Sequence, residues 1–108
     1  MSVLEFRPEG IYCSQGDFYI DPWRPVERAL ITHGHSDHAR YGSKKYLCTE
    51  MAAPVIRHRL GDVKIETIPY EKKINLNGVN ISFHPAGHVP GSAQILAEIN
   101  GGKMGCIW

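Results

Sequence analysis

Residues 29–38 read ALITHGHSDH, an apolar run that passes directly into three histidines and an aspartate. The apolar run 29–31 is typical of a strand buried on both faces. In the extended segment after it, side chains two residues apart point the same way, so His33 and His35 can share one metal ion. Asp37 and His38 then enter a turn and face another direction, where they are placed to serve a second metal. The alternative interpretation is a histidine-rich surface loop whose side chains have no role as metal ligands.

A second histidine segment, residues 83–93, reads FHPAGHVPGSA. His88 follows a Pro-Ala-Gly bend and is the predicted third ligand beside His33 and His35, because neighbouring glycines let the backbone pack closely around it. His84 lies at the end of a strand and is interpreted as a packing residue, or one that orients a ligand. His58, at a helix end beside two arginines, is interpreted as solvated. Imidazole and carboxylate ligands suit zinc, manganese or iron.

The other elements predict an α/β fold with a mixed sheet and hairpins. Asn77-Gly78 indicates a type I′ hairpin turn, and Gly16-Asp17 a second hairpin. Pro54 in the first turn and Gly61 after the last indicate one helix. A shorter helical turn is expected from Ser36 towards Tyr41. The expected strands are 12–13, 18–20, 29–31, 46–48, 74–76, 79–83 and 93–99, and the expected helix is 53–60.

Length, charge and cysteine content exclude several classes of protein. A length of 108 residues allows one domain, and 12 Lys+Arg against 11 Asp+Glu exclude a strongly basic arm or an acidic tail. Without an apolar run long enough for a membrane span, and with Glu5, Arg7 and Glu9 near the start, we expect a cytoplasmic protein without a membrane partner. Three cysteines without a C-x-x-C pair argue against a disulfide framework and a cysteine zinc site.

Both histidine segments, with residues 16–25 (GDFYIDPWRP) and 85–88 (PAGH), resemble the metallo-β-lactamase fold. Within it they resemble the β-CASP branch of nucleases, and there the bacterial ligase-associated DNA exonucleases, which are homologues of the mRNA 3′-end processing factor. The resemblance extends from about Arg7 to Asn100. It implies the N-terminal half of an αββα sandwich, so residues 1–108 are expected to form a partial metallo-β-lactamase domain.

The resemblance also implies roles for individual residues. His33, His35 and His88 would hold one Zn²⁺, with Mn²⁺ as an alternative metal, and Asp37 and His38 would belong to a second. Asp21 matches an aspartate that steadies the ligand loop by hydrogen bonding; a plain turn residue before Pro22 is the alternative.

The implied activity is metal-dependent phosphodiester hydrolysis, in which a hydroxide held between two metals attacks phosphorus. Asp37 is expected to orient that nucleophile. Arg40, Lys44 and Lys45 are interpreted either as phosphate contacts or as an ordinary solvated face. DNA is favoured over RNA, with digestion from the 3′ end beside a DNA ligase system. A hydrolase of a small thioester or ester, and an inactive zinc-binding fragment, are the alternatives.

The chain departs from the family pattern in one large respect. It has no Asp or Glu after Glu98 and no His after His88, whereas the family uses a later bridging aspartate, a final histidine and an inserted β-CASP domain. We therefore expect the first part of a longer enzyme, with the register of residues 104–108 in doubt. Alone, the chain is expected to bind about one zinc tightly, to be nearly inactive, and to bury its sheet on one side only, which would leave an apolar face exposed.

Overall fold

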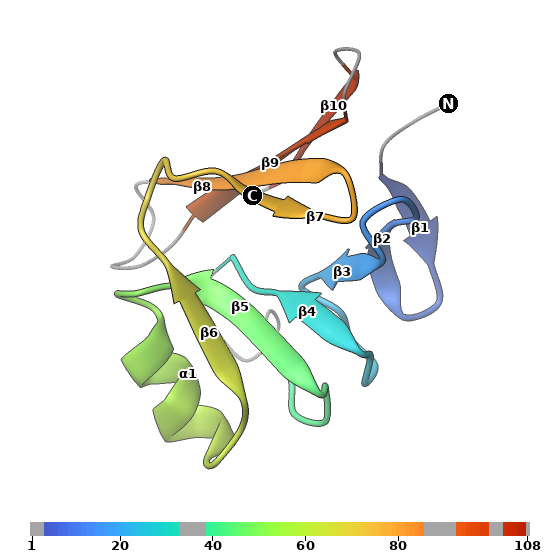
Figure 1. Ribbon diagram of the computed structural model, residues 1–108. Coiled ribbons are helices and arrows are strands. Elements are labelled where there is room, and N and C mark those ends of the chain that lie inside the picture. The colour runs from blue at the N-terminus through green and yellow to red at the C-terminus, as the bar shows by residue number, and fades with distance from the viewer. Residues whose placement is uncertain (1–3, 33–38, 86–92, 100–102, 108) are drawn as a thin grey trace.

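The computed structural model describes residues 4–32, 39–85, 93–99 and, for the backbone only, 103–107. These residues form two sheets and one helix (Figure 1). The elements are β1 Glu5–Arg7, β2 Gly10–Cys13, β3 Phe18–Ile20, β4 Arg28–Leu30, β5 Lys45–Thr49, α1 Ala53–Leu60, β6 Ile65–Ile68, β7 Ile74–Leu76, β8 Val79–Pro85, β9 Ala93–Ile99 and β10 Lys103–Ile107.

The first sheet has the strand order β1-β2-β3-β4-β5-β6. Strands β1 to β3 pair antiparallel through short turns, and Asp17 takes a positive φ of 57° in the second turn. Strands β3 to β6 pair parallel, with Ile20 opposite Leu30 and Leu30 opposite Leu47. The carboxyl ends of β3, β4 and β5 therefore share one edge of the sheet, and their amino ends share the other.

The second sheet is antiparallel, with the order β10-β9-β8-β7. Asn77 and Gly78 join β7 to β8 with φ values of 54° and 89°, as the two central residues of a type I′ turn require. The predicted hairpin is thus confirmed. Residues 103–107 continue the sheet as β10, with Lys103 opposite Ile99.

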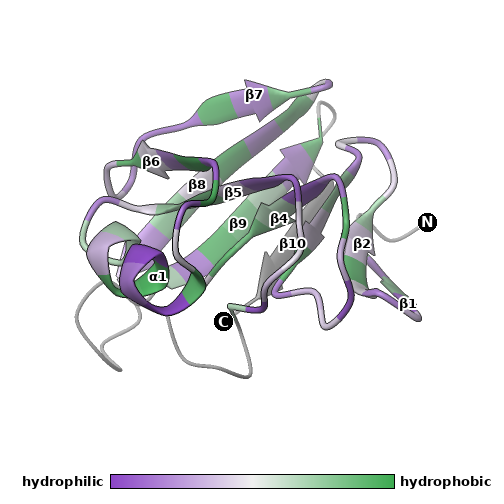
Figure 2. Cartoon of the chain, turned by 90° about the horizontal axis from the view of Figure 1, so that it is seen from below, coloured by the Kyte–Doolittle hydropathy of each residue, from purple (hydrophilic) through white to green (hydrophobic). Residues whose placement is uncertain are grey.

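Two apolar clusters lie on opposite faces of the first sheet. Leu30 points into the cluster between the two sheets, whereas its neighbours Ala29 and Ile31 point into a cluster that α1 covers with Ile56. Figure 2 shows the hydrophilic side of α1 turned away from the strands. The expectation that the sheet is buried on one side only is therefore wrong for β4 and β5 of the first sheet, where α1 covers one face and the second sheet covers the other. Among the described residues, no helix covers the outer face of the second sheet.

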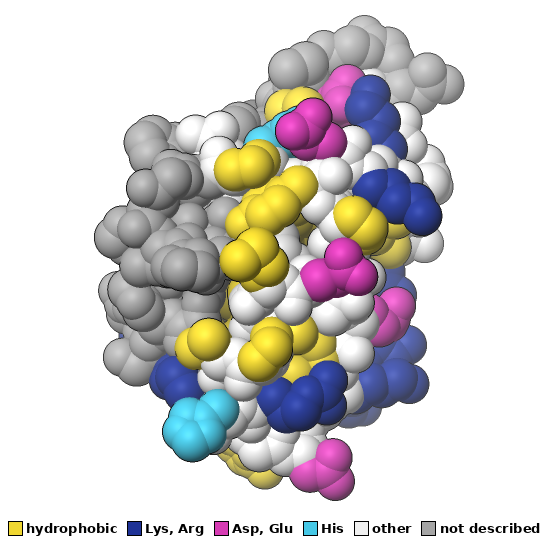
Figure 3. All heavy atoms as spheres, turned by 90° about the vertical axis from the view of Figure 1, so that its left-hand side faces the viewer, with side chains coloured by type: hydrophobic (Ala, Val, Ile, Leu, Met, Phe, Trp, Pro, Cys, Tyr) yellow, Lys and Arg dark blue, Asp and Glu magenta, His cyan; other side chains and the backbone are white. Residues whose placement is uncertain are grey.

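The outer face of the second sheet is mostly polar in the described residues. Asn80, Ser82 and His84 alternate along β8 with Val79, Ile81 and Phe83, which are fully buried in the inter-sheet core. Figure 3 shows another side of the molecule, the left-hand side of Figure 1, where hydrophobic side chains gather in a band with most of the charged side chains beside it. Along β8 the outer face of the second sheet is thus polar, which differs from the expected exposed apolar face.

Three strands, β1, β6 and β10, are not among those expected from the sequence. In β6, Glu66 and Thr67 are both exposed, so the strand lacks the apolar alternation that would predict it. In β1, all three residues are exposed, and the strand is held at the sheet edge by backbone pairing with β2. Helix α1 has the predicted bounds, and the helical turn expected from Ser36 begins outside the described residues.

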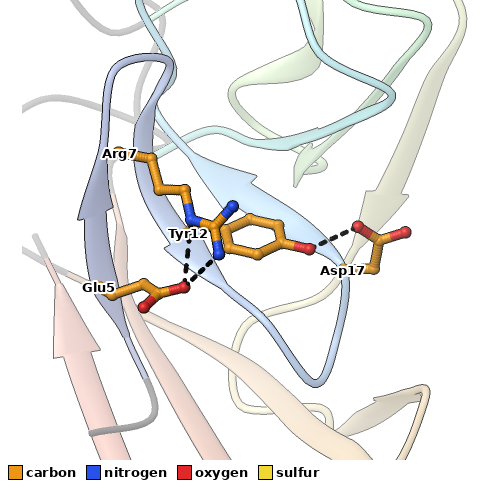
Figure 4. Close-up of polar contacts among 4 residues, drawn as sticks. All are labelled: Glu5, Arg7, Tyr12 and Asp17. Atoms are coloured by element: carbon orange, nitrogen blue, oxygen red, sulfur yellow. Dashed lines mark hydrogen bonds and ion pairs between the residues drawn. The ribbon is translucent and has the colours of Figure 1, made fainter.

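Polar contacts reinforce the outer part of the first sheet (Figure 4). Arg7 donates to Glu5 at 2.7 Å, and its guanidinium lies 4.5 Å from the centre of the Tyr12 ring. The Tyr12 hydroxyl in turn donates to Asp17 at 2.8 Å. This hydrogen bond is the main reason that the pKa of Tyr12 is raised.

Candidate metal centre

Thr32 connects β4 to the first histidine segment and is held by a carboxylate. Its backbone N–H donates to Asp21 Oδ1 at 2.8 Å, and its hydroxyl donates to Asp21 Oδ2 at 2.6 Å. Asp21 directly follows β3, takes a φ of 44°, and donates its own N–H to the Leu30 carbonyl at 2.9 Å. The parallel pairing of β3 and β4 thus places the carboxylate beside the residue that precedes His33.

The same threonine also connects the two histidine segments. The Thr32 carbonyl accepts a hydrogen bond from the Ala93 N–H at 2.8 Å. Ala93 is the first residue of β9 and directly follows residues 86–92, the segment that contains His88. The described ends of the two segments therefore meet at one backbone hydrogen bond.

The chain is also fixed where it leaves the first histidine segment. Ala39 is fully buried, and its carbonyl accepts from Arg59 Nη1 of α1 at 3.0 Å. The Arg40 carbonyl accepts from the Tyr46 hydroxyl of β5 at 2.6 Å. Helix α1 and strand β5 therefore anchor the downstream end of the segment, as Asp21 anchors its upstream end.

The predicted metal ligands His33, His35, Asp37, His38 and His88 lie outside the described residues. Within the described ranges, no group of three His, Cys, Asp or Glu side chains is arranged to hold a metal ion. The ligand set therefore stays a prediction, whereas the contacts of its flanking residues are observed.

The remaining predicted site residues fall in different places. His84 lies half-buried on β8 with Nε2 2.8 Å from the Ser82 hydroxyl oxygen. The Arg40 side chain is exposed, while its backbone carbonyl accepts the hydrogen bond from Tyr46. Lys44 and Lys45 lie at the amino end of β5, so they are at the sheet edge opposite Thr32. The structure thus brings Asp21 to Thr32, the residue before the first histidine segment, and places the two lysines at the opposite edge of the sheet.

Sequence reasoning did not find Thr32, Arg59 or Tyr46. Thr32 adjoins the histidines, and its position between them and a buried strand could have singled it out. Arg59 donates to a carbonyl 20 positions earlier in the chain and Tyr46 to one 6 positions earlier. No sequence pattern predicts either contact.

The described cysteines take no part in this region. Burial raises the pKa of the Cys48 thiol to about 12, and burial also raises the pKa of Cys13. Both are therefore neutral thiols near pH 7, whereas metal ligands and nucleophiles are thiolates.

Among the described residues, no helix has the length and apolar character needed to cross a bilayer.

Comparison with known proteins identifies the fold. No family model matches the chain. A protein named "Rm3 metallo-beta-lactamase" superposes with a TM-score of 0.59 and 17% identity, over 95% of this chain and 52% of that one. The chain accordingly adopts half of a metallo-β-lactamase fold, as the sequence predicts.

Two curated relatives match by sequence. A "Probable DNA ligase" of Opitutus terrae is 35% identical over 91 residues, which cover 82% of this chain and 9% of the relative. An "RNase J-like protein" of Methanocaldococcus jannaschii is 26% identical, over 75% of this chain and 24% of the relative. The chain thus spans less than a quarter of the length of each of these curated relatives.

Proposed function

We propose that this chain supplies the first metal-binding part of a metal-dependent hydrolase that cleaves phosphodiester bonds in nucleic acid. The observation that carries the proposal is the hydrogen bond between the Thr32 carbonyl and the Ala93 N–H, at 2.8 Å. It joins the two parts of the chain in which the sequence concentrates histidines. The metallo-β-lactamase fold and the names of the two relatives support the same class of reaction.

The donor set suits zinc or manganese. Under this proposal His33, His35 and His88 hold one metal ion, and Asp37 and His38 contribute to a second. Imidazole and carboxylate groups are ordinary ligands of both metals. When bound, such an ion supplies a water acidic enough to ionise near pH 7 and a positive charge for the phosphoryl oxygens.

The chain's own residues have separate tasks. Asp21 fixes both the N–H and the hydroxyl of Thr32, which sets the direction in which the backbone enters His33. Arg59 fixes the carbonyl of Ala39 at the other end of the same segment. Asp37 is proposed to accept a hydrogen bond from the attacking water and so to orient its lone pair towards phosphorus.

We propose DNA as the substrate, digested from its 3′ end in the cytoplasm beside a DNA ligase. The relative named as a probable DNA ligase has the higher identity of the two curated relatives and matches 82% of this chain. The RNase J-like relative makes RNA the competing substrate. Since the chain spans only part of each relative, the proposal concerns the whole enzyme of which this chain would be one part.

The first experiment measures metal binding by the 108-residue chain. Wild type is expected to bind about one zinc tightly by elemental analysis after gel filtration. His33→Ala and His88→Ala are each expected to lose that ion, while His58→Ala, on the exposed side of α1, keeps it. Retention of zinc by the His33 and His88 variants would contradict the proposed ligands.

The second experiment measures activity with the whole enzyme of which this chain would be one part. End-labelled DNA and RNA are incubated with Zn²⁺ or Mn²⁺, with and without a chelator, beside the Asp37→Ala variant. Chelator-sensitive digestion of DNA that Asp37→Ala abolishes supports the proposal, and digestion of RNA alone would replace the substrate. If neither polymer is cleaved but a small thioester or ester is, the enzyme is a small-molecule hydrolase.

A further inference from the structure

The amino ends of the parallel strands border a basic hollow at the edge of the molecule opposite Thr32. Its volume is about 400 Å³, within the usual range for small-ligand pockets. It is lined by Asp17, Glu27, Arg28, Lys44, Lys45, Lys64 and Asn77. None of these residues belongs to the candidate metal centre.

Strand pairing aligns three of the cations side by side. Arg28 is the register partner of Lys45 in the parallel pair of β4 and β5. Lys64 directly precedes β6, and its carbonyl accepts from the Tyr46 N–H at 2.9 Å, which places it next to Lys45. Like charges on neighbouring strands repel and destabilise a sheet. Three neighbouring cations are therefore unfavourable unless an anion lies among them.

The acidic residues of the hollow already have partners. Glu27 accepts from Lys44 Nζ at 3.2 Å, and Asp17 accepts from the Tyr12 hydroxyl at 2.8 Å (Figure 4). Among the described residues, no ion pair involves Arg28, Lys45 or Lys64. One further carboxylate, Glu66, lines a smaller adjoining hollow of about 60 Å³ that Arg28 and Lys45 also border. The larger hollow thus has an excess of positive charge.

The walls of the hollow are fixed across the two sheets. The Asn77 side chain, in the turn of the second sheet, donates to the Gly16 carbonyl in a turn of the first sheet at 2.7 Å. On the other side, the Lys44 N–H donates to the Val26 carbonyl at 3.0 Å and the Lys45 N–H to the Glu27 carbonyl at 3.1 Å. The backbone around the cations is thus held in place by hydrogen bonds, which favours a preformed site over a loose group of surface lysines.

We infer that this hollow is a second site, which binds the phosphate group of an anionic ligand through Arg28, Lys45 and Lys64. The guanidinium offers paired donors, and the two ammonium groups offer point charges, the two modes by which proteins hold phosphate. A free phosphate ester and a phosphate of a nucleic-acid strand share this chemistry. The inference does not rest on the proposed hydrolase.

The test titrates the protein with inorganic phosphate, adenosine monophosphate and a short single-stranded oligonucleotide at physiological ionic strength. Amide NMR signals of Arg28, Lys45 and Lys64 are expected to shift saturably, and Lys45→Gln combined with Lys64→Gln is expected to weaken binding at least tenfold. Lys72→Gln, an exposed lysine outside the hollow, is the matched control and should stay within twofold of wild type.

Two further readouts complete the test. Without phosphate, the double variant is expected to melt at the same or a higher temperature than wild type, because charge repulsion is relieved; a lower melting temperature would contradict the inference. Equal binding of phosphate and the mononucleotide indicates a free phosphate ester, and much tighter oligonucleotide binding indicates a nucleic-acid strand. The absence of saturable binding by all three probes, or equal weakening by Lys72→Gln, would overturn it.

Discussion

The Asp21 carboxylate receives both hydrogen-bond donors of one residue, Thr32, at 2.8 and 2.6 Å. Hydrogen bonds to a charged acceptor in a partly buried place are among the stronger ones, at about 1.5–3 kcal/mol each. Replacing Asp21 is therefore costly in stability. In the sequence alone, its position after a short strand and before Pro22 is also typical of a turn residue. The observed contacts hold Thr32, and the role of Asp21 in steadying the metal ligands stays a prediction.

The first prediction concerns this carboxylate. Asp21→Asn keeps the shape of the side chain and removes its charge and one acceptor, so the free energy of unfolding is expected to fall by about 1–3 kcal/mol. Zinc affinity is expected to fall by about 10–100-fold, the usual cost of losing a group that orients a ligand. Urea unfolding and competitive zinc titration measure the two effects. Asp62→Asn, at an exposed aspartate, should change neither.

The second prediction concerns the Cys48 thiol, whose pKa is raised to about 12 by burial. At pH 8 only about one molecule in 10⁴ carries the thiolate, so iodoacetamide should leave Cys48 unmodified in the native protein and label it in urea. The folded state binds the proton more tightly than the unfolded state, so stability is lost as the pH rises from about 8.5 towards 12, by about 1.4 kcal/mol per pH unit. Peptide mapping by mass spectrometry measures the labelling, and labelled Cys48 in the native protein at pH 8 would contradict the prediction.

At the scale of the elements, turn and capping residues made the hairpins and the helix predictable. Asn77-Gly78 and Pro54 with Gly61 each impose a backbone conformation on their own neighbours. Strand β6 was not predictable in the same way, because its polar residues depend on pairing with β5 for their conformation. The same reason applies to the site: Asp21 could be proposed from the family resemblance that residues 16–25 carry, whereas the contact of Arg59 with Ala39 exists only in the folded chain.

The third prediction tests the turn between β7 and β8. Gly78 has a φ of 89°, which a residue with a Cβ rarely adopts, so Gly78→Ala is expected to cost about 1 kcal/mol or more. The added Cβ would meet the end of the Gln15 side chain at 3.0 Å, a group that can move, so the backbone conformation accounts for most of the cost. Thermal unfolding measures the change. Asn80→Ala, on an exposed strand position nearby, should have a smaller effect.

At the scale of the whole molecule, the two sheets depend on the cluster between them. Ile81 and Phe83 of β8 are fully buried there, in the same cluster as Leu30 and Ile95. A small domain has a total stability of about 5–15 kcal/mol, so one large core truncation removes a considerable share of it.

The fourth prediction follows from that cluster. Ile81→Ala is expected to lower the free energy of unfolding by about 2–5 kcal/mol, because it removes buried methyl groups and leaves a cavity. Val55→Ala, at a side chain that is 47% exposed on α1, should cost much less. Urea denaturation monitored by circular dichroism compares the two variants. Equal losses would mean that the inter-sheet cluster does not carry the stability assigned to it.

The hydrogen bond between Thr32 and Ala93 joins two residues that are 61 positions apart in the chain. Closing a flexible loop of that length costs about 3–4 kcal/mol of chain entropy. In this fold the backbone pairing of β-strands meets that cost, so an ion that bridges the two histidine segments would not have to gather them from a disordered chain. Its affinity would then reflect the ligands themselves, and a peptide joining the two segments by a short linker without the sheets should bind the ion far more weakly.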